Sequence, residues 1–193
     1  MITLLFATNN THKLAEVQAM CPAHIHIIGM QQAGYTMDIP EPYHTFEANA
    51  QEKCRVLVAH TGLPCFAEDS GLLIDALDGA PGVLSARYAG THGNHEANIA
   101  KVLTQLQGVS NRAAHFKTVI SLYLNQAYHT YVGECHGTIT EQVSGSGGFG
   151  YDPIFVPNGY KDTFAILDPE VKNNISHRSK AFEKLVIFLN NYA

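Results

Sequence analysis

The chain has 193 residues, of which 46% are hydrophobic and 15% charged, so it is a globular protein and not a disordered one. Its formal net charge of −5 at pH 7 argues against nucleic-acid and anionic-membrane partners, because both need a basic surface. If the protein recognises phosphate, a few placed cations must do so locally.

The length fits one domain, or two lobes that share one core. The first residues lack the features of a signal peptide, and no apolar stretch reaches the length of a membrane span. The four cysteines are scattered in apolar surroundings and form no C-x-x-C pair, which indicates reduced core residues. Together these features predict a cytoplasmic protein.

Residues 2–7 form a continuous apolar run, which predicts a buried strand, and apolar residues then recur at helical spacing after Lys13. The polar turn 8–13 between strand and helix is a place where backbone amides bind anions. Lys13 at the helix start opposes the helix dipole, and a bound phosphate would reverse that penalty. A capped surface helix with a solvated lysine explains the same residues equally well.

The next helix is predicted from Thr45, its N-cap, to about residue 59, with Gly62 just past its end. Asn49 and Lys53 share a face away from the apolar stripe, which could point into a cleft, although we expect it to point into water as the commoner case. Glu41 lies between two prolines, which restrict its backbone. It is therefore a candidate metal ligand.

Glu68, Asp69 and Ser70 follow one apolar run and precede another, which predicts a bend at Gly71 between two buried segments. Buried carboxylates are usually paired or bound to metal. An acidic turn that caps a helix is the alternative interpretation.

A glycine- and proline-rich loop is predicted over residues 79–90, and a helix over residues 94–107. Two strands, 115–124 and 129–139, are joined by a short turn. This hairpin makes the predicted sheet at least partly antiparallel.

Residues 145–150 match G-x-G-x-x-G, but a proline and a strand-like run follow, so the sequence does not predict a dinucleotide-binding helix. Phe149 on this loop could stack on a planar ring, although a flexible turn is the alternative. Ser176 is the predicted N-cap of the last helix. His177 and Arg178 in its first turn again oppose the dipole, with Lys172 just upstream, which indicates a second anion-facing helix end.

Carboxylates that suit Mg²⁺, cations and helix ends that suit phosphate, and an exposed aromatic together indicate phosphoryl chemistry on a nucleotide. Their spacing does not identify the bond that is broken. The chain resembles the Ham1-like (inosine triphosphate pyrophosphatase) family in blocks that follow the family's order along nearly its whole length: residues 8–13, 45–53, 67–72, 81–88, 148–155 and 172–178. One departure is Ala48, where the family usually has Glu, with Glu47 beside it; this puts metal affinity in doubt.

The resemblance implies an α/β fold: residues 1–193 form one elongated, two-lobed domain around a mixed, partly antiparallel sheet flanked by helices, with an active-site cleft between the lobes. It implies a homodimer that hydrolyses ITP, dITP and XTP to monophosphate and pyrophosphate with Mg²⁺, which cleanses the nucleotide pool. Asp69 would be catalytic, and Glu41 and Asp69 would bind the metal. The residues implied to bind substrate are Thr8, Asn9, Asn10, Thr11, His12, Lys13, Lys53, Ser70, Phe149, Gly150, Tyr151, Asp152, Lys172, His177 and Arg178.

Two other interpretations stay open. A Maf-like pyrophosphatase would act on pyrimidine or 7-methylguanine nucleotides with a related fold. A nucleotide-binding module would keep the pocket without catalysis, although the acids at positions 41 and 69 disfavour this.

Overall fold

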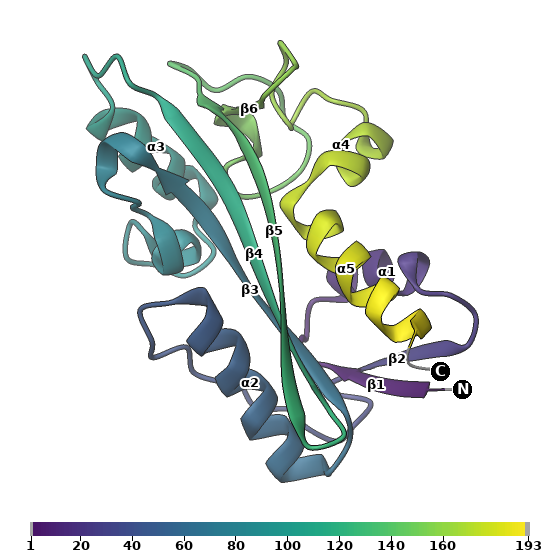
Figure 1. The fold of residues 1–193 in the computed structure, drawn as a ribbon. Helices are drawn as coiled ribbons and strands as arrows, with labels where there is room; N and C mark the ends of the chain where they lie inside the picture. Colours follow the sequence, from purple (N-terminus) through teal and green to yellow (C-terminus); the bar gives the residue numbers. More distant parts are fainter. Residues whose placement is uncertain (1, 192–193) are drawn as a thin grey trace. The chain divides into compact units, whose positions relative to one another are not determined.

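A computed structural model describes the backbone of residues 2–191 and their side chains, except those of His12, Glu16 and Ala19. One six-stranded sheet runs in the order β2-β1-β3-β4-β5-β6 (Figure 1). β1 pairs in parallel with β2 and β3, while β5 and β6 are antiparallel, so the predicted α/β fold with a mixed sheet is confirmed. The strands are β1 (Ile2–Phe6), β2 (Ile25–Gly29), β3 (Cys65–Ile74), β4 (Ala113–Leu124), β5 (Ala127–Ile139) and β6 (Phe155–Pro157).

The helices lie between these strands and after them. They are α1 (Thr11–Met20), α2 (Phe46–Thr61), α3 (His95–Gln105), α4 (Pro169–Ile175) and α5 (His177–Asn191), with 3₁₀ turns η1 (Asp75–Leu77), η2 (Gly82–Arg87) and η3 (Asp152–Ile154). None of these helices, in the described part of the chain, has the length and apolar character needed to cross a bilayer.

The chain divides into two compact units, and β3, β4 and β5 contribute to both. The first unit contains residues 1–69, 118–132 and 181–193. The second contains residues 70–117 and 133–180.

In the first unit, alternating residues of β1 pack on opposite faces of the sheet, as the period of a strand requires. Leu4 and Phe6 face the cluster that includes Phe182 of α5, whereas Leu5 faces the cluster that includes Leu57 of α2. The helices α2 and α5 therefore cover opposite faces (Figure 1). This sandwich buries Leu4, Leu5 and Phe6 from both sides, which explains the apolar sequence of this part of β1.

In the second unit, α3 packs its apolar stripe of Ile99, Val102 and Leu106 against a core rich in aromatic side chains. The rings of Phe116 and Phe155 lie with their centroids 4.7 Å apart in an edge-to-face arrangement. This core supports the segments that carry the candidate site residues of the same unit, among them Phe149, Lys172 and Arg178.

The ends of α2 confirm their prediction. Thr45 Oγ1 accepts a hydrogen bond from the Ala48 N–H at 3.2 Å, and Gly62 ends the helix in the left-handed region with φ of 68°. The hairpin β4–β5 is also confirmed, and Asn125 and Gln126 form its tight turn with positive φ.

The predicted bend at Gly71 is wrong, because β3 runs without interruption from Cys65 to Ile74. The strand can carry two adjacent carboxylates through a buried region because each has partners from other elements. The predicted loop at residues 79–90 contains the 3₁₀ helix η2, and α4 was not predicted.

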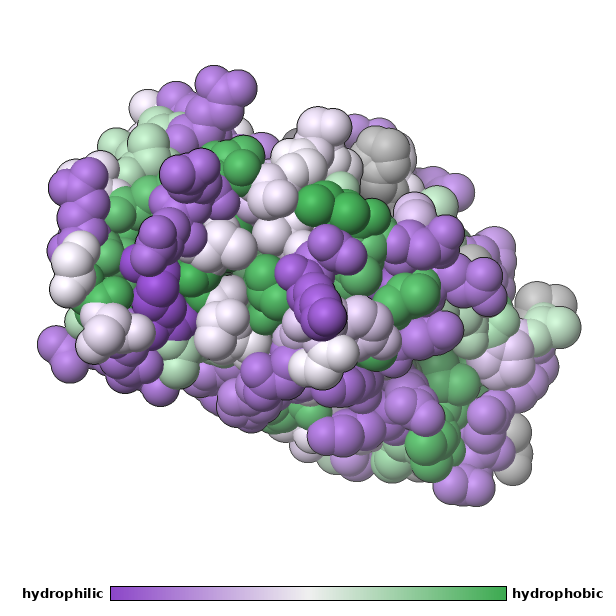
Figure 2. All heavy atoms as spheres, turned by 90° about the horizontal axis from the view of Figure 1, so that it is seen from above, coloured by the Kyte–Doolittle hydropathy of each residue, from purple (hydrophilic) through white to green (hydrophobic). Residues whose placement is uncertain are grey.

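On the face shown in Figure 2, hydrophobic side chains gather in small groups that hydrophilic ones separate. The large exposed apolar residues, such as Met37, Val143 and Ile187, come from distant parts of the sequence.

Candidate functional site

The segment between β1 and α1 is ordered by its own side chains. Thr8 Oγ1 accepts from the Asn10 N–H at 3.0 Å, and Asn10 Oδ1 accepts from the Lys13 N–H at 3.2 Å, which caps α1. Thr8, Asn9 and Thr11 line a hollow of about 390 Å³ beside α1. The His12 side chain lies outside the described residues.

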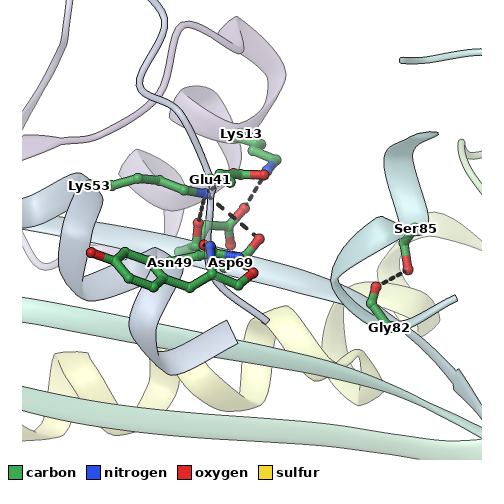
Figure 3. A network of polar contacts seen from close by, with 9 residues as sticks. Lys13, Glu41, Asn49, Lys53, Asp69, Gly82 and Ser85 are labelled. Carbon is green, nitrogen blue, oxygen red and sulfur yellow. Dashed lines mark hydrogen bonds and ion pairs between the residues drawn. The ribbon is translucent and has the colours of Figure 1, made fainter. Parts of the chain in front are cut away.

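Two lysines of the first unit pair with three carboxylates (Figure 3). Lys13 Nζ lies 2.7 Å from Glu68 Oε1, and Glu68 is only 3% exposed. Lys53 Nζ forms an ion pair with Glu41 and lies 3.7 Å from Asp69 Oδ1. The structure thus brings together Lys13, Lys53, Glu41 and Asp69, which come from four separate segments of the sequence.

The expectation that Asn49 and Lys53 face water is wrong, because both side chains are buried. Lys53 Nζ donates to the Glu68 carbonyl at 2.8 Å in addition to its ion pairs. Asn49 Nδ2 donates to Asp69 Oδ2 at 3.1 Å. Burial is tolerated here because charged and polar atoms from β3 and from the loop before α2 satisfy both side chains.

The oxygen atoms around Lys53 suit a hard cation. A carboxylate of Glu41, a carboxylate of Asp69 and the Glu68 carbonyl all lie around one ammonium group. Oxygen donors of this kind are the ligands that Mg²⁺ prefers. No set of three or more His, Cys, Asp or Glu side chains among the described residues has the arrangement of a complete metal site. These oxygen atoms therefore suit a divalent cation but do not complete its coordination.

In the second unit, Phe149 presents an aromatic ring that is 50% exposed. Lys172 Nζ lies 4.9 Å from the ring centroid, and the Arg178 guanidinium carbon lies 5.6 Å from it. Exposed aromatic surface beside two cations can accept a flat, electron-rich or anionic ligand.

Asp152 fixes the loop that carries Phe149. Its Oδ2 accepts from the Phe149 N–H at 2.7 Å and from Lys172 Nζ at 2.6 Å. A Cβ atom at Gly148 would overlap this same oxygen, and Gly148 and Gly150 both have positive φ, at 72° and 61°. The glycines therefore allow the close approach that lets one buried carboxylate position both the ring and a lysine.

Tyr151 is buried, and its hydroxyl donates to the Ser85 carbonyl at 2.9 Å. Burial is the main cause that raises the pKa of Tyr151 above its ordinary value. Ser85 Oγ also accepts from the Leu72 N–H at 2.9 Å and donates to the Gly82 carbonyl at 2.6 Å (Figure 3). Tyr151 and Ser85 together attach η2 to the glycine-rich loop.

His177 and Arg178, in the first turn of α5, are buried. The His177 ring stacks on Phe116, with centroids 4.8 Å apart and planes 13° from parallel. Ser176 Oγ accepts from the Ser179 N–H at 3.1 Å, as its predicted role as N-cap requires. Ser70 follows Asp69 in β3 and is partly buried.

Asn49 and Ser85 were not among the predicted site residues, although both lie in blocks that carry the family resemblance. The spacing of Asn49 and Lys53, one helical turn apart, was the available signal for Asn49. Nothing in the local sequence identified the partners of either residue.

Comparison with known proteins gives consistent matches over nearly the whole chain. The model of the Ham1 family matches residues 4–188. The chain is 46% identical to a dITP/XTP pyrophosphatase of Flavobacterium psychrophilum, covering 97% of this chain and 99% of that protein. It is also 46% identical to a dITP/XTP pyrophosphatase of Porphyromonas gingivalis, covering 98% of each chain. The solved structure of a HAM1 protein from Coxiella burnetii matches with a TM-score of 0.94 and 41% identity, covering 99% of this chain and 100% of that one.

Proposed function

Since this chain belongs to the Ham1 family, we propose that it hydrolyses non-standard purine nucleoside triphosphates, namely ITP, dITP and XTP, to the monophosphate and pyrophosphate. Relatives named dITP/XTP pyrophosphatase cover almost the full chain at 46% identity. The observation that carries this proposal within the molecule is the group of Lys13, Lys53, Glu41, Glu68 and Asp69, of which Lys53, Glu68 and Asp69 are buried. It supplies cations for phosphates and carboxylates for a divalent metal in one place.

We assign the triphosphate to the start of α1 and the two lysines near it. The start of α1 offers the positive end of its helix dipole, and Lys13 and Lys53 offer charge. Glu41 and Asp69 would hold Mg²⁺, which would supply charge neutralisation on the phosphate oxygens. Asp69 would also orient the attacking water and accept its proton as the bond from the α-phosphorus to the bridging oxygen breaks.

We assign the purine to the loop that carries Phe149. Phe149 would stack on the base, and Lys172, His177 and Arg178 would surround the edge of the base and the phosphates of the nucleotide. Hypoxanthine and xanthine carry a 6-oxo acceptor where adenine has an amino donor. A donor such as Arg178 would be left unpaired by adenine, and mismatches of this kind reach roughly 10⁴-fold in discrimination.

The test is pyrophosphate release from ITP, dITP, XTP, ATP and GTP, with and without Mg²⁺. We expect fast release from the first three nucleotides, only with Mg²⁺. Activity confined to pyrimidine or 7-methylguanine nucleotides would instead favour a Maf-like enzyme. Binding of ITP without pyrophosphate release would favour a nucleotide-binding module.

We also propose that the protein acts in the cytoplasm as a homodimer. Light scattering coupled to size-exclusion chromatography tests the assembly. A mass near 21 kDa, that of a single chain, would contradict it.

A further inference from the structure

The side chain of Asn49 connects the loop that carries Glu41 to the carboxylate of Asp69 (Figure 3). Its Oδ1 accepts from the Tyr43 N–H at 2.9 Å, and its Nδ2 donates to the Tyr43 carbonyl at 3.2 Å. The same Nδ2 donates to Asp69 Oδ2 at 3.1 Å. Asn49 is fully buried, so these hydrogen bonds form away from competing water.

We infer that Asn49 is a positioning residue for the hydrolysis, which holds Asp69 and the Glu41 loop in one fixed geometry; this rests on the proposed function. Tyr43 lies two residues after Glu41, and Pro42 between them restricts the backbone. Fixing both backbone groups of Tyr43 therefore fixes the path of the chain that presents Glu41. The single Nδ2 group sets the distance between this loop and the carboxylate that would activate water.

The helix itself does not need these hydrogen bonds. Thr45 already caps α2 through the Ala48 N–H, and Phe46, Ala50 and Leu57 anchor the helix through their burial. Asn49 differs from a buried asparagine that bonds backbone groups alone, because its Nδ2 also donates to the carboxylate of Asp69.

Replacing Asn49 by aspartate tests this directly. Asn49→Asp keeps an oxygen for the Tyr43 N–H but places a carboxylate where the amide donated to Asp69 Oδ2, 3.1 Å away. The variant therefore keeps the shape of the side chain and its contact with the loop, and it removes the donor toward Asp69.

Other charged groups also act on Asp69 in this variant and are unchanged in it. Lys53 reaches it from α2, and the Glu41 loop lies against it. Glu68, beside it in β3, is paired with Lys13 from α1. The variant therefore changes one group among constant neighbours.

We expect kcat for ITP in Asn49→Asp to fall about 10²-fold at pH 8.5, the lower range for a lost general base. KM should change little, because Asn49 is assigned no contact with the nucleotide. A kcat close to that of the wild type, or a rise in KM without a fall in kcat, would overturn the inference.

Asn98 in α3 provides a matched control. It is as buried as Asn49, and it bonds backbone groups of a neighbouring loop: Oδ1 accepts from the Ala89 N–H at 2.7 Å, and Nδ2 donates to the Ser85 and Ala86 carbonyls, both at 3.3 Å. Asn98→Asp should lower the melting temperature as much as Asn49→Asp does, without the fall in kcat. The same fall in kcat in both variants would mean that general destabilisation is the cause.

A second measurement needs no catalysis. In protein free of metal and nucleotide, the Tyr43 amide should exchange its hydrogen about 10-fold faster in Asn49→Ala than in the wild type, and at an unchanged rate in Asn98→Ala. Unchanged exchange in Asn49→Ala would overturn the connection to the Glu41 loop. A wild-type protein that releases no pyrophosphate from any of the nucleotides tested would overturn the proposed function itself, whereas an active wild type with unaffected Asn49 variants would overturn only this inference.

Discussion

Removing the ring of Phe149 tests where the base binds. The side chain is half exposed, so it is available to a ligand and contributes little to the core. Lys172 and Arg178 lie over its ring. We expect Phe149→Ala to raise KM for ITP while kcat and the melting temperature stay close to those of the wild type, because a contact made equally in ground and transition states affects binding alone.

The size of the effect follows from the exposed area. An aromatic side chain has roughly 200 Å² of surface, so about 100 Å² of Phe149 remains for a base to cover, worth at most about 2.5 kcal/mol at about 25 cal/mol/Å². Measured losses on removing stacking side chains are about 1–3 kcal/mol per base. Since about 1.4 kcal/mol is a factor of ten, KM should rise about 10- to 100-fold.

Steady-state pyrophosphate release over a range of ITP concentrations measures both constants. Phe149→Tyr should keep KM near the wild-type value because the ring remains. Tyr160→Ala removes another exposed aromatic of the same unit, 40% exposed, and should change neither constant. An unchanged KM in Phe149→Ala, or an equal rise in Tyr160→Ala, would refute the stacking role.

Four other changes have defined outcomes. Asp69→Asn should lower kcat about 10²- to 10⁴-fold yet still bind ITP in equilibrium titration, because it removes a proton acceptor and metal ligand but no stacking contact. Gly148→Ala should raise KM for ITP and lower the melting temperature, since a Cβ atom overlaps Asp152 Oδ2 and φ is positive. Thr118→Val should raise the free energy of unfolding by about 1 kcal/mol, measured in urea, because the fully buried Thr118 hydroxyl has no hydrogen-bond partner within the described part of the chain. Burial lowers the pKa of His115 below 6.5, so protonation favours the unfolded state; His115→Gln should therefore lose less thermal stability than the wild type as the pH falls below about 6.5.

Elements whose signals are local could be predicted from the sequence. The start and end of α2 depend on Thr45 and Gly62, which act within a few residues of themselves. The tight turn between β4 and β5 is set in the same way. The start of α4 carries such a signal as well, because Asp168 Oδ1 accepts from the Glu170 N–H at 2.8 Å and Pro169 follows at the first helical position.

Features that depend on distant partners could not be predicted in this way. A glycine such as Gly71 is compatible with a bend and with a continuous strand. Pairing with the strands that flank β3 in the sheet keeps it extended here. The burial of Asn49 depends on Asp69, twenty residues further along the chain. Local rules predict that the polar face of α2 is solvated, because the polar side chains of an isolated helix can form hydrogen bonds only with water.

The carboxylates of the first unit explain why Lys13 and Lys53 occupy positions that local rules disfavour for cations. They also indicate which charge a ligand of these lysines must supply. Lys13 stands in the first turn of α1, where the helix dipole disfavours a cation, but Glu68 compensates it at 2.7 Å. Lys53 is compensated in the same way by Glu41 and Asp69, so three carboxylates face two ammonium groups. Phosphate oxygens that bind these lysines would displace carboxylates whose charge then needs a new partner in a buried place. Under the proposed function, a divalent cation bound with the triphosphate would supply that partner, so this network would favour a metal-bound nucleotide over a free one.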